Sequence, residues 1–118
     1  MSADLPLRTR ATQPDRPRAV EQRRTVRYAV DEPALVIVGK HALACRMNDI
    51  SLGGAMLEGP LPLKTEDHFR LMVLDLPELV CRVAHVGDGF LGVSFVNGQQ
   101  INRSLGMWIR KRCRVEEL

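Results

Sequence analysis

Two short groups of polar residues in this chain have the types and spacing needed to bind an anionic ligand. The first group is R-x-x-x-R with one further arginine inserted, formed by Arg23, Arg24 and Arg27 in the stretch EQRRTVRYAV. Guanidinium groups are planar and always charged, and they contact phosphates and the O6 and N7 edge of guanine through paired hydrogen bonds. Taken alone, the group also fits a solvated run of charge in an arginine-rich tail.

The second group is D-x-S-x-x-G, formed by Asp49, Ser51 and Gly54 in the stretch NDISLGGAM. A carboxylate can accept hydrogen bonds from guanine N1–H and N2–H₂, a hydroxyl can donate or accept, and a glycine lets a ligand approach the backbone. Taken alone, this pattern is typical of a turn, because Asp and Ser side chains bond nearby backbone N–H groups and Gly supplies positive φ. Together the two groups predict a site that satisfies both the phosphate and the base of a guanine nucleotide.

The elements that must position these groups are short strands. Apolar residues alternate with polar ones or run together, between turn signals about ten residues apart, in the segments 34–39, 42–50, 54–59, 69–76, 78–87 and 90–96. Gly39, Lys40 and His41 fit a tight hairpin, and the Pro-containing segment 60–67 fits a loop. Five or six antiparallel strands in a chain of this size predict a small barrel or a sandwich.

After the last strand the apolar period changes from that of a strand to that of a helix. One helical stripe is formed by Ile101, Leu105, Trp108, Ile109 and Cys113. We expect a helix over about 99–114 that closes one end of the barrel. Asn97 and Gln100 are spaced as in a capping box at its start.

Length and charge limit the number of domains and the class of ligand that this sequence can have. The 118 residues suffice for one domain, which we place at 21–118, after a flexible lead-in at 1–20 that has three prolines and no apolar period. Residues 1–30 carry seven arginines against three acidic side chains, whereas residues 31–118 carry ten basic and eleven acidic side chains. A basic nucleic-acid footprint across the domain is therefore not expected, and the aromatic fraction of 4% is low for base stacking.

No catalytic or metal chemistry is predicted. The sequence has no C-x-x-C pair, no phosphate-cradling G-x-x-x-x-G-K and no G-x-S-x-G around Ser51, so we expect no enzyme and no cofactor. The three histidines lie on different segments without acidic residues at ligand spacing, which predicts no metal site; they are His41, His68 and His85. No segment has the length of a membrane span or the apolar centre of a signal peptide, so we expect a cytoplasmic protein without membrane insertion.

The combination of these features resembles the PilZ domain, the bacterial receptor module for cyclic di-GMP. The likeness rests on the arginines ahead of a β-domain, on Asp49, Ser51 and Gly54 some twenty residues later, and on GVSF at 92–95. It extends from about Gln22 to the final helix. The resemblance implies a six-stranded antiparallel β-barrel with a C-terminal helix.

The resemblance also implies roles for individual residues. Arg23 and Arg27 match the two motif arginines that hold phosphates and guanine edges from a flexible segment, and Arg24 matches a frequent additional arginine. Asp49 and Ser51 match residues that bond the guanine, and Gly54 matches a glycine that keeps the surface open. Gln22 occupies the position where an arginine favours a stacked ligand dimer, so we expect one ligand molecule per chain.

We therefore expect a cyclic di-GMP receptor whose N-terminal arginine segment changes conformation on binding and signals through a protein partner. Two alternatives remain from other classes of protein. One is a PilZ-like interaction module that binds no nucleotide, and the other is a small barrel that binds nucleic acid through its basic tail. The sequence leaves the pathway, the partner and the oligomeric state open.

Overall fold

The computed structural model describes residues 26–113, and the expected lead-in at 1–20 as well as Gln22, Arg23 and Arg24 lie outside this range. Six strands are followed by one helix. The elements are β1 (Tyr28–Val38), β2 (His41–Ile50), β3 (Gly54–Glu58), β4 (His68–Val73), β5 (Leu79–Val86), β6 (Phe90–Phe95) and α2 (Gly98–Cys113).

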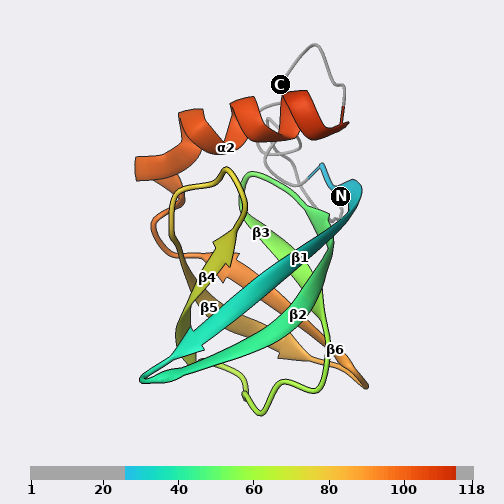
Figure 1. Cartoon of the computed structure of the whole chain (residues 1–118), viewed down its shortest axis with the longest axis vertical. Helices are drawn as coiled ribbons and strands as arrows, with labels where there is room; N and C mark the ends of the chain where they lie inside the picture. Colours follow the sequence, from blue (N-terminus) through green and yellow to red (C-terminus); the bar gives the residue numbers. More distant parts are fainter. Residues whose placement is uncertain (1–25, 114–118) are drawn as a thin grey trace, which may run out of the picture.

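The strands form a closed barrel in the order β1-β2-β3-β6-β5-β4, and all neighbours are antiparallel. Closure comes from the pairing of β1 with β4, where Leu35 lies opposite Met72. Figure 1 shows α2 lying across one end of this barrel. The structure thus confirms the mainly β fold of six antiparallel strands with a C-terminal helix, and it decides for a barrel over a sandwich.

The core fills the barrel with alternate side chains from every strand and with one stripe of α2. On β5, for example, Leu79, Cys81 and Val83 are all fully buried, as the period of two predicts. The helix adds Ile101, Leu105, Trp108 and Ile109 to the same cluster. The expected helical stripe is therefore confirmed, with Cys113 packed at its edge.

Polar contacts hold α2 on the barrel. The indole Nε1 of Trp108 donates to the carbonyl of Leu74 at 3.0 Å. Arg112 pairs with Glu32 at 2.8 Å and with Asp75 at 2.9 Å, and its guanidinium lies 4.9 Å from the centre of the Trp108 ring. The last turn of the helix is thereby tied both to β1 and to the segment after β4.

The expected capping box at the start of α2 is wrong. The backbone carbonyl of Asn97 does accept from the amides of Gln100 and Ile101, but its side chain serves another element. The amide oxygen of Asn97 accepts from the backbone N–H of Val80, and its NH₂ group donates to the carbonyl of Glu78. Asn97 therefore fixes the helix start against the beginning of β5.

Strand β1 begins six residues earlier than the apolar run at 34–39 predicts. An irregularity in its pairing with β2 falls between Ala29 and Glu32 and carries the chain through a polar stretch. Pro33 is tolerated because the pairing with β4 starts only at Ala34. The early start brings Arg27 to the edge of the barrel.

Two further bulges interrupt the alternation of β2 and β5. On β2 the pairing with β3 shifts between Met47 and Asp49, and on β5 the pairing with β6 shifts between Val83 and His85. A bulge inserts one extra residue and so turns the following side chain to the other face. Met47 and Ile50 both face the core as a result, although they are three positions apart.

The described part of the chain, residues 26–113, contains no helix long and apolar enough to cross a membrane.

Candidate functional site

The two predicted groups meet in space at the edge of the barrel. The Nη1 atom of Arg27 lies 2.7 Å from the Oδ1 atom of Asp49, although the two residues are 22 positions apart. The side chain of Arg27 is 46% exposed and that of Asp49 is 27% exposed, so both can be reached from solvent. An arginine of the first group and the carboxylate of the second therefore form one polar surface.

The bulge at Asn48 is what places Asp49 on this surface. Cys45 and Met47 face the core, so an uninterrupted period of two would turn the carboxylate of residue 49 inward as well. Because of the extra residue, Asp49 instead lies opposite Met56 of β3. Met56 is flanked along β3 by Ala55 and Leu57, which are both buried. The carboxylate thus points out of the barrel, where it meets Arg27.

Ser51 lies in the turn between β2 and β3 and is buried, with 3% of its surface exposed. Its hydroxyl oxygen accepts from the amides of Gly53 and Gly54, both at 3.1 Å, and its own proton is placed to bond the carbonyl of Gly54 at 3.3 Å. The backbone N–H of Ser51 also donates to the Gly54 carbonyl. In this structure the hydroxyl therefore shapes the turn that supports the site.

Gly54 begins β3 and is required for the close approach of two strands. A Cβ atom at this position would lie 2.1 Å from the backbone carbonyl oxygen of Val93 on β6. The φ angle of Gly54 is not positive, so the glycine is required for space and not for a left-handed backbone conformation. Gly54 therefore supports the surface by letting β3 pair with β6.

A hollow of about 240 Å³ lies on this surface and joins most of the described residues of the two groups. Its lining includes Arg27, Ser51 and Gly54 from the predicted site. Asp49 borders it through its ion pair with Arg27. The remaining lining residues, which were not predicted as site residues, are Gly53, Ala84, His85, Gly92, Val93 and Ser94.

His85 had been set aside together with the other histidines because no metal ligands accompany it in the sequence. Its position depends on the register of β5 and β6, for which the sequence carries no signal. The turn at 87–90 is closed by a hydrogen bond from the amide of Gly87 to the carbonyl of Phe90, which sets His85 opposite Gly92. A histidine opposite a glycine on an outward position is exposed to any ligand that lies on that face.

The arginines on the strands of the barrel are each paired with a carboxylate. Arg46 pairs with Asp31, Arg70 with Glu78, and Arg82 with Glu66, all within 3.1 Å. Such exposed pairs add little stability, but they neutralise the surface locally. Within residues 26–113 the barrel wall thus presents paired charges and no continuous basic stripe.

The thiols have no features of a nucleophile. Burial raises the pKa of Cys45 to about 11. Burial, and after it repulsion from the thiolate that Cys45 forms at high pH, raises the pKa of Cys81 to about 12. Both thiols are therefore protonated at neutral pH. No group of three or more His, Cys, Asp or Glu side chains gathers as in a metal site anywhere in the part of the chain that the structure describes.

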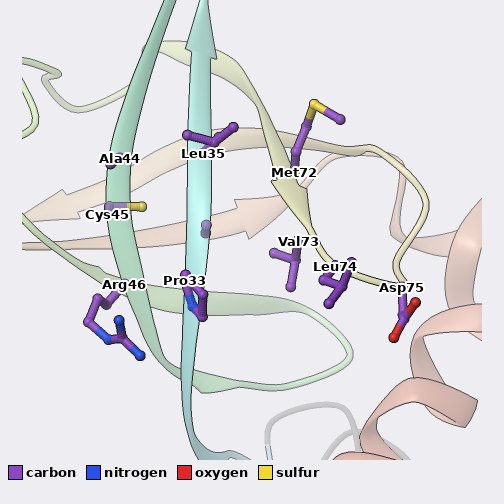
Figure 2. A pocket seen from close by; sticks show the side chains of 10 residues that line it. Pro33, Leu35, Ala44, Cys45, Arg46, Met72, Val73, Leu74 and Asp75 are labelled. Carbon is purple, nitrogen blue, oxygen red and sulfur yellow. The ribbon is translucent and has the colours of Figure 1, made fainter.

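A larger and more apolar hollow, of about 740 Å³, lies on a different part of the barrel wall. Leu35 of β1 is flanked there by Ala44 of β2 and Met72 of β4, its partners in register. Figure 2 shows Leu35 and Met72 on neighbouring strands, with Leu74 just beyond the end of β4. We refer to Leu35, Ala44, Met72 and Leu74 as the apolar face; none of them was predicted to have a role.

Comparison with known proteins gives one family. The model of the PilZ domain matches residues 21–109. Among solved structures, the PilZ domain of CeSA from a cellulose-synthesizing bacterium is 23% identical, with a TM-score of 0.55, and the match covers 79% of this chain and 100% of that one. An uncharacterized Legionella protein, Lpg0364, is 17% identical, with a TM-score of 0.53, over 74% of this chain and 94% of that one. No curated protein matched the chain.

Proposed function

Because the chain belongs to the PilZ domain family, we propose that it is a non-catalytic receptor for cyclic di-GMP that signals through a partner protein. The observation that carries this proposal is the contact of 2.7 Å between Arg27 and Asp49, which joins the two predicted groups into one surface. A guanine nucleotide needs both a cation for its phosphate and an acceptor for the N–H groups of its base.

The chemistry of binding follows from these two side chains. The Asp49 carboxylate accepts from guanine N1–H and N2–H₂, and the Arg27 guanidinium contacts a phosphate or the O6 and N7 edge. Both groups must first give up their mutual ion pair, which is partly exposed and worth only about 1 kcal/mol or less. Charge-assisted hydrogen bonds to the ligand are worth roughly 1.5–3 kcal/mol each, so the exchange favours binding.

Ser51 and Gly54 contribute through the turn that they build. The hydroxyl of Ser51 holds the amides of Gly53 and Gly54, and these residues line the hollow beside Arg27. A base lying on this surface meets mostly backbone, which allows a close approach. Direct hydrogen bonding of the ligand by the Ser51 hydroxyl is part of the proposal and requires that the hydroxyl give up one of its bonds within the turn.

The proposal includes Arg23 and Arg24, which precede the described residues. They would add cations to the ligand's phosphates, and the segment that carries them would change conformation as these charges are neutralised, which alters the surface offered to a partner. With Gln22 in place of an arginine, one ligand molecule is expected per chain. The proposal also includes a cytoplasmic location, which fractionation of cells would test.

The two alternative functions would require different surfaces on the barrel. A nucleic-acid-binding barrel would need free cations along its wall, but Arg46, Arg70 and Arg82 are paired with carboxylates. An interaction module without nucleotide would have no need for Asp49 to be turned outward beside Arg27. Both observations support the receptor.

Calorimetric titration with cyclic di-GMP, cyclic di-AMP and GTP side by side tests the proposal. We expect saturable binding of cyclic di-GMP, with a stoichiometry of about one per chain, and much weaker binding of the other two. Equal binding of all three would overturn guanine recognition by Asp49. No binding of any of them would leave the interaction module as the better assignment.

A further inference from the structure

His85 lies on the same outward row of the barrel wall as Asp49. In the register of the sheet, Asp49 of β2 is opposite Met56 of β3, Met56 is opposite Gly92 of β6, and Gly92 is opposite His85 of β5. Residues opposite one another in neighbouring strands project from the same face. The carboxylate and the imidazole are thus the two ends of one row that crosses four strands.

A bulge turns each of the two residues, His85 and Asp49, to the outside of the barrel. Leu79, Cys81 and Val83 face the core, so an uninterrupted β5 would turn the imidazole of residue 85 inward. The bulge at Ala84 places His85 opposite Gly92 instead, and its side chain is exposed. Bulges are often found beside binding sites, where they re-aim a side chain. Asp49 is turned outward by the bulge at Asn48 in the same way.

Gly92 seats the ring of His85. A Cβ atom on Gly92 would lie 2.1 Å from Cε1, 2.5 Å from Nδ1 and 2.8 Å from Nε2 of the imidazole. The ring therefore occupies the space that a side chain at position 92 would fill, and Gly92 is buried although its position faces outward. The absence of a side chain at 92 fixes where the imidazole lies.

His85 differs in kind from the other described residues that line the hollow. The hollow of about 240 Å³ has Arg27 and Ser51 as polar groups and Gly53, Gly54 and Gly92 as stretches of bare backbone. Among the described residues that line it, His85 alone carries an aromatic ring. A purine that enters this hollow has one cationic neighbour, a low floor of backbone, and one planar surface against which it can stack.

Resting on the proposed function, we infer that His85 is a ligand-contacting residue that adds affinity for the cyclic dinucleotide. Its imidazole provides the planar surface against which one purine of the cyclic dinucleotide stacks, and Gly92 holds the imidazole in place. Stacking is sequence-tolerant among bases, so His85 adds affinity for a purine ring, while discrimination for guanine comes from Asp49.

Titration of the full chain with cyclic di-GMP at fixed pH and salt tests this inference. Base stacking on an aromatic side chain is worth about 1–3 kcal/mol, so His85→Ala should weaken binding by about fivefold or more. His85→Phe keeps a flat ring and should stay within about twofold of the unchanged chain. The matched control is His41→Ala, because His41 is also exposed on a strand but belongs to the β1–β2 hairpin.

The outcomes separate this inference from the proposed function. If Arg27→Ala loses binding while His85→Ala binds like the unchanged chain, the role of His85 is overturned and the receptor function stands. If His85→Ala and His85→Phe lose affinity equally, stacking is overturned. If the unchanged chain does not bind cyclic di-GMP, the proposed function fails and the inference fails with it.

A double-mutant cycle tests whether Gly92 acts through His85. Gly92→Ala should displace the imidazole and weaken binding about as much as His85→Ala does. In the His85→Ala background the new methyl group finds free space, so Gly92→Ala should change affinity by less than about twofold. Effects that simply add would overturn the seating role, and thermal unfolding of each variant shows whether the barrel remains folded.

Discussion

Two parts of the barrel wall are built from the same kind of strand but offer different surfaces. The apolar face, formed by Leu35, Ala44, Met72 and Leu74, lies around a stretch where β1 and β4 pair without a shift in register. The motif face, formed by Arg27, Asp49, Ser51, Gly54, His85, Gly92 and Ser94, lies over strands whose register is broken by bulges on β2 and β5. Regular alternation gives the first face, and interrupted alternation gives the second.

The difference teaches where polar chemistry can be placed on a small barrel. On the motif face, each bulge turns a polar side chain outward from a position that regular alternation would bury, namely Asp49 on β2 and His85 on β5. Glycines at 54 and 92 then leave room for backbone or for a ring. The apolar face has no such interruption, and Leu35 and Met72 are simply the outward partners of buried neighbours, each more than 40% exposed.

The largest expected effect comes from changing Gly54, which supports the motif face by letting β3 pair closely with β6. Gly54→Ala would place a methyl group 2.1 Å from the Val93 carbonyl, so β3 and β6 must move apart. We expect the free energy of unfolding to fall by about 3 kcal/mol, which lowers the melting temperature by roughly 10–20 °C. Thermal denaturation followed by circular dichroism measures this change.

Gly87→Ala is the matched control for that substitution. A Cβ atom at Gly87 would lie 3.8 Å from the carbonyl oxygen of Phe90, an ordinary contact distance. The melting temperature should therefore change by only a few degrees. Equal destabilisation by both substitutions would show that Gly54 has no special steric role.

The next largest effect is expected from removing the negative charge of Asp49 on the motif face. Asp49→Asn keeps the shape of the side chain but replaces one acceptor oxygen by a donor, so it can no longer accept from both N–H groups of a guanine. We expect the Kd for cyclic di-GMP to rise by about tenfold, with the melting temperature unchanged within a few degrees. Calorimetry gives the first quantity; an unchanged Kd would remove Asp49 from the ligand site.

A smaller effect is expected on the apolar face. Met72 is 49% exposed on β4, so Met72→Gln should change the free energy of unfolding by no more than about 0.5 kcal/mol. The affinity for cyclic di-GMP should also stay within about twofold, because the residue lies outside the hollow that contains Arg27. A large loss of affinity would contradict the separation of the two faces.

The smallest effect concerns the thiol beneath the apolar face. Cys45 lines the floor of that hollow but is buried, and burial raises its pKa to about 11. At pH 7.5 the thiol is protonated and covered, so iodoacetamide should label the half-buried Cys113 before Cys45. Mass spectrometry after partial labelling checks the order, and rapid labelling of Cys45 would show that the floor is open.

Much of the barrel could be predicted from alternation, but the positions of its bulges could not. Periods of two identified the six strands, and the helical stripe identified α2, since both patterns report burial directly. A bulge adds a single residue and leaves no composition signal, so the outward turn of Asp49 was invisible in the sequence. The first half of β1 was missed because Asp31, Glu32 and Pro33 do not resemble a strand.

The candidate site could be predicted in part. The types and spacing of Arg27 and Asp49 anticipated a shared surface, and the structure places them in contact. The sequence could not reveal that the hydroxyl of Ser51 is engaged in its own turn, because that depends on the local backbone path. His85 was missed because its relation to Gly92 depends on the bulge at Ala84. Arg23 and Arg24 lie outside the described residues and remain predictions.

The most direct test of the central claim is the affinity of three chains for cyclic di-GMP, measured by calorimetry at one salt concentration. Arg27→Ala removes the guanidinium that pairs with Asp49, whereas Arg103→Ala removes an exposed arginine from α2 as a matched control. We predict a rise in Kd of at least about tenfold for Arg27→Ala and no change for Arg103→Ala. Equal affinity of all three chains would contradict the proposed site.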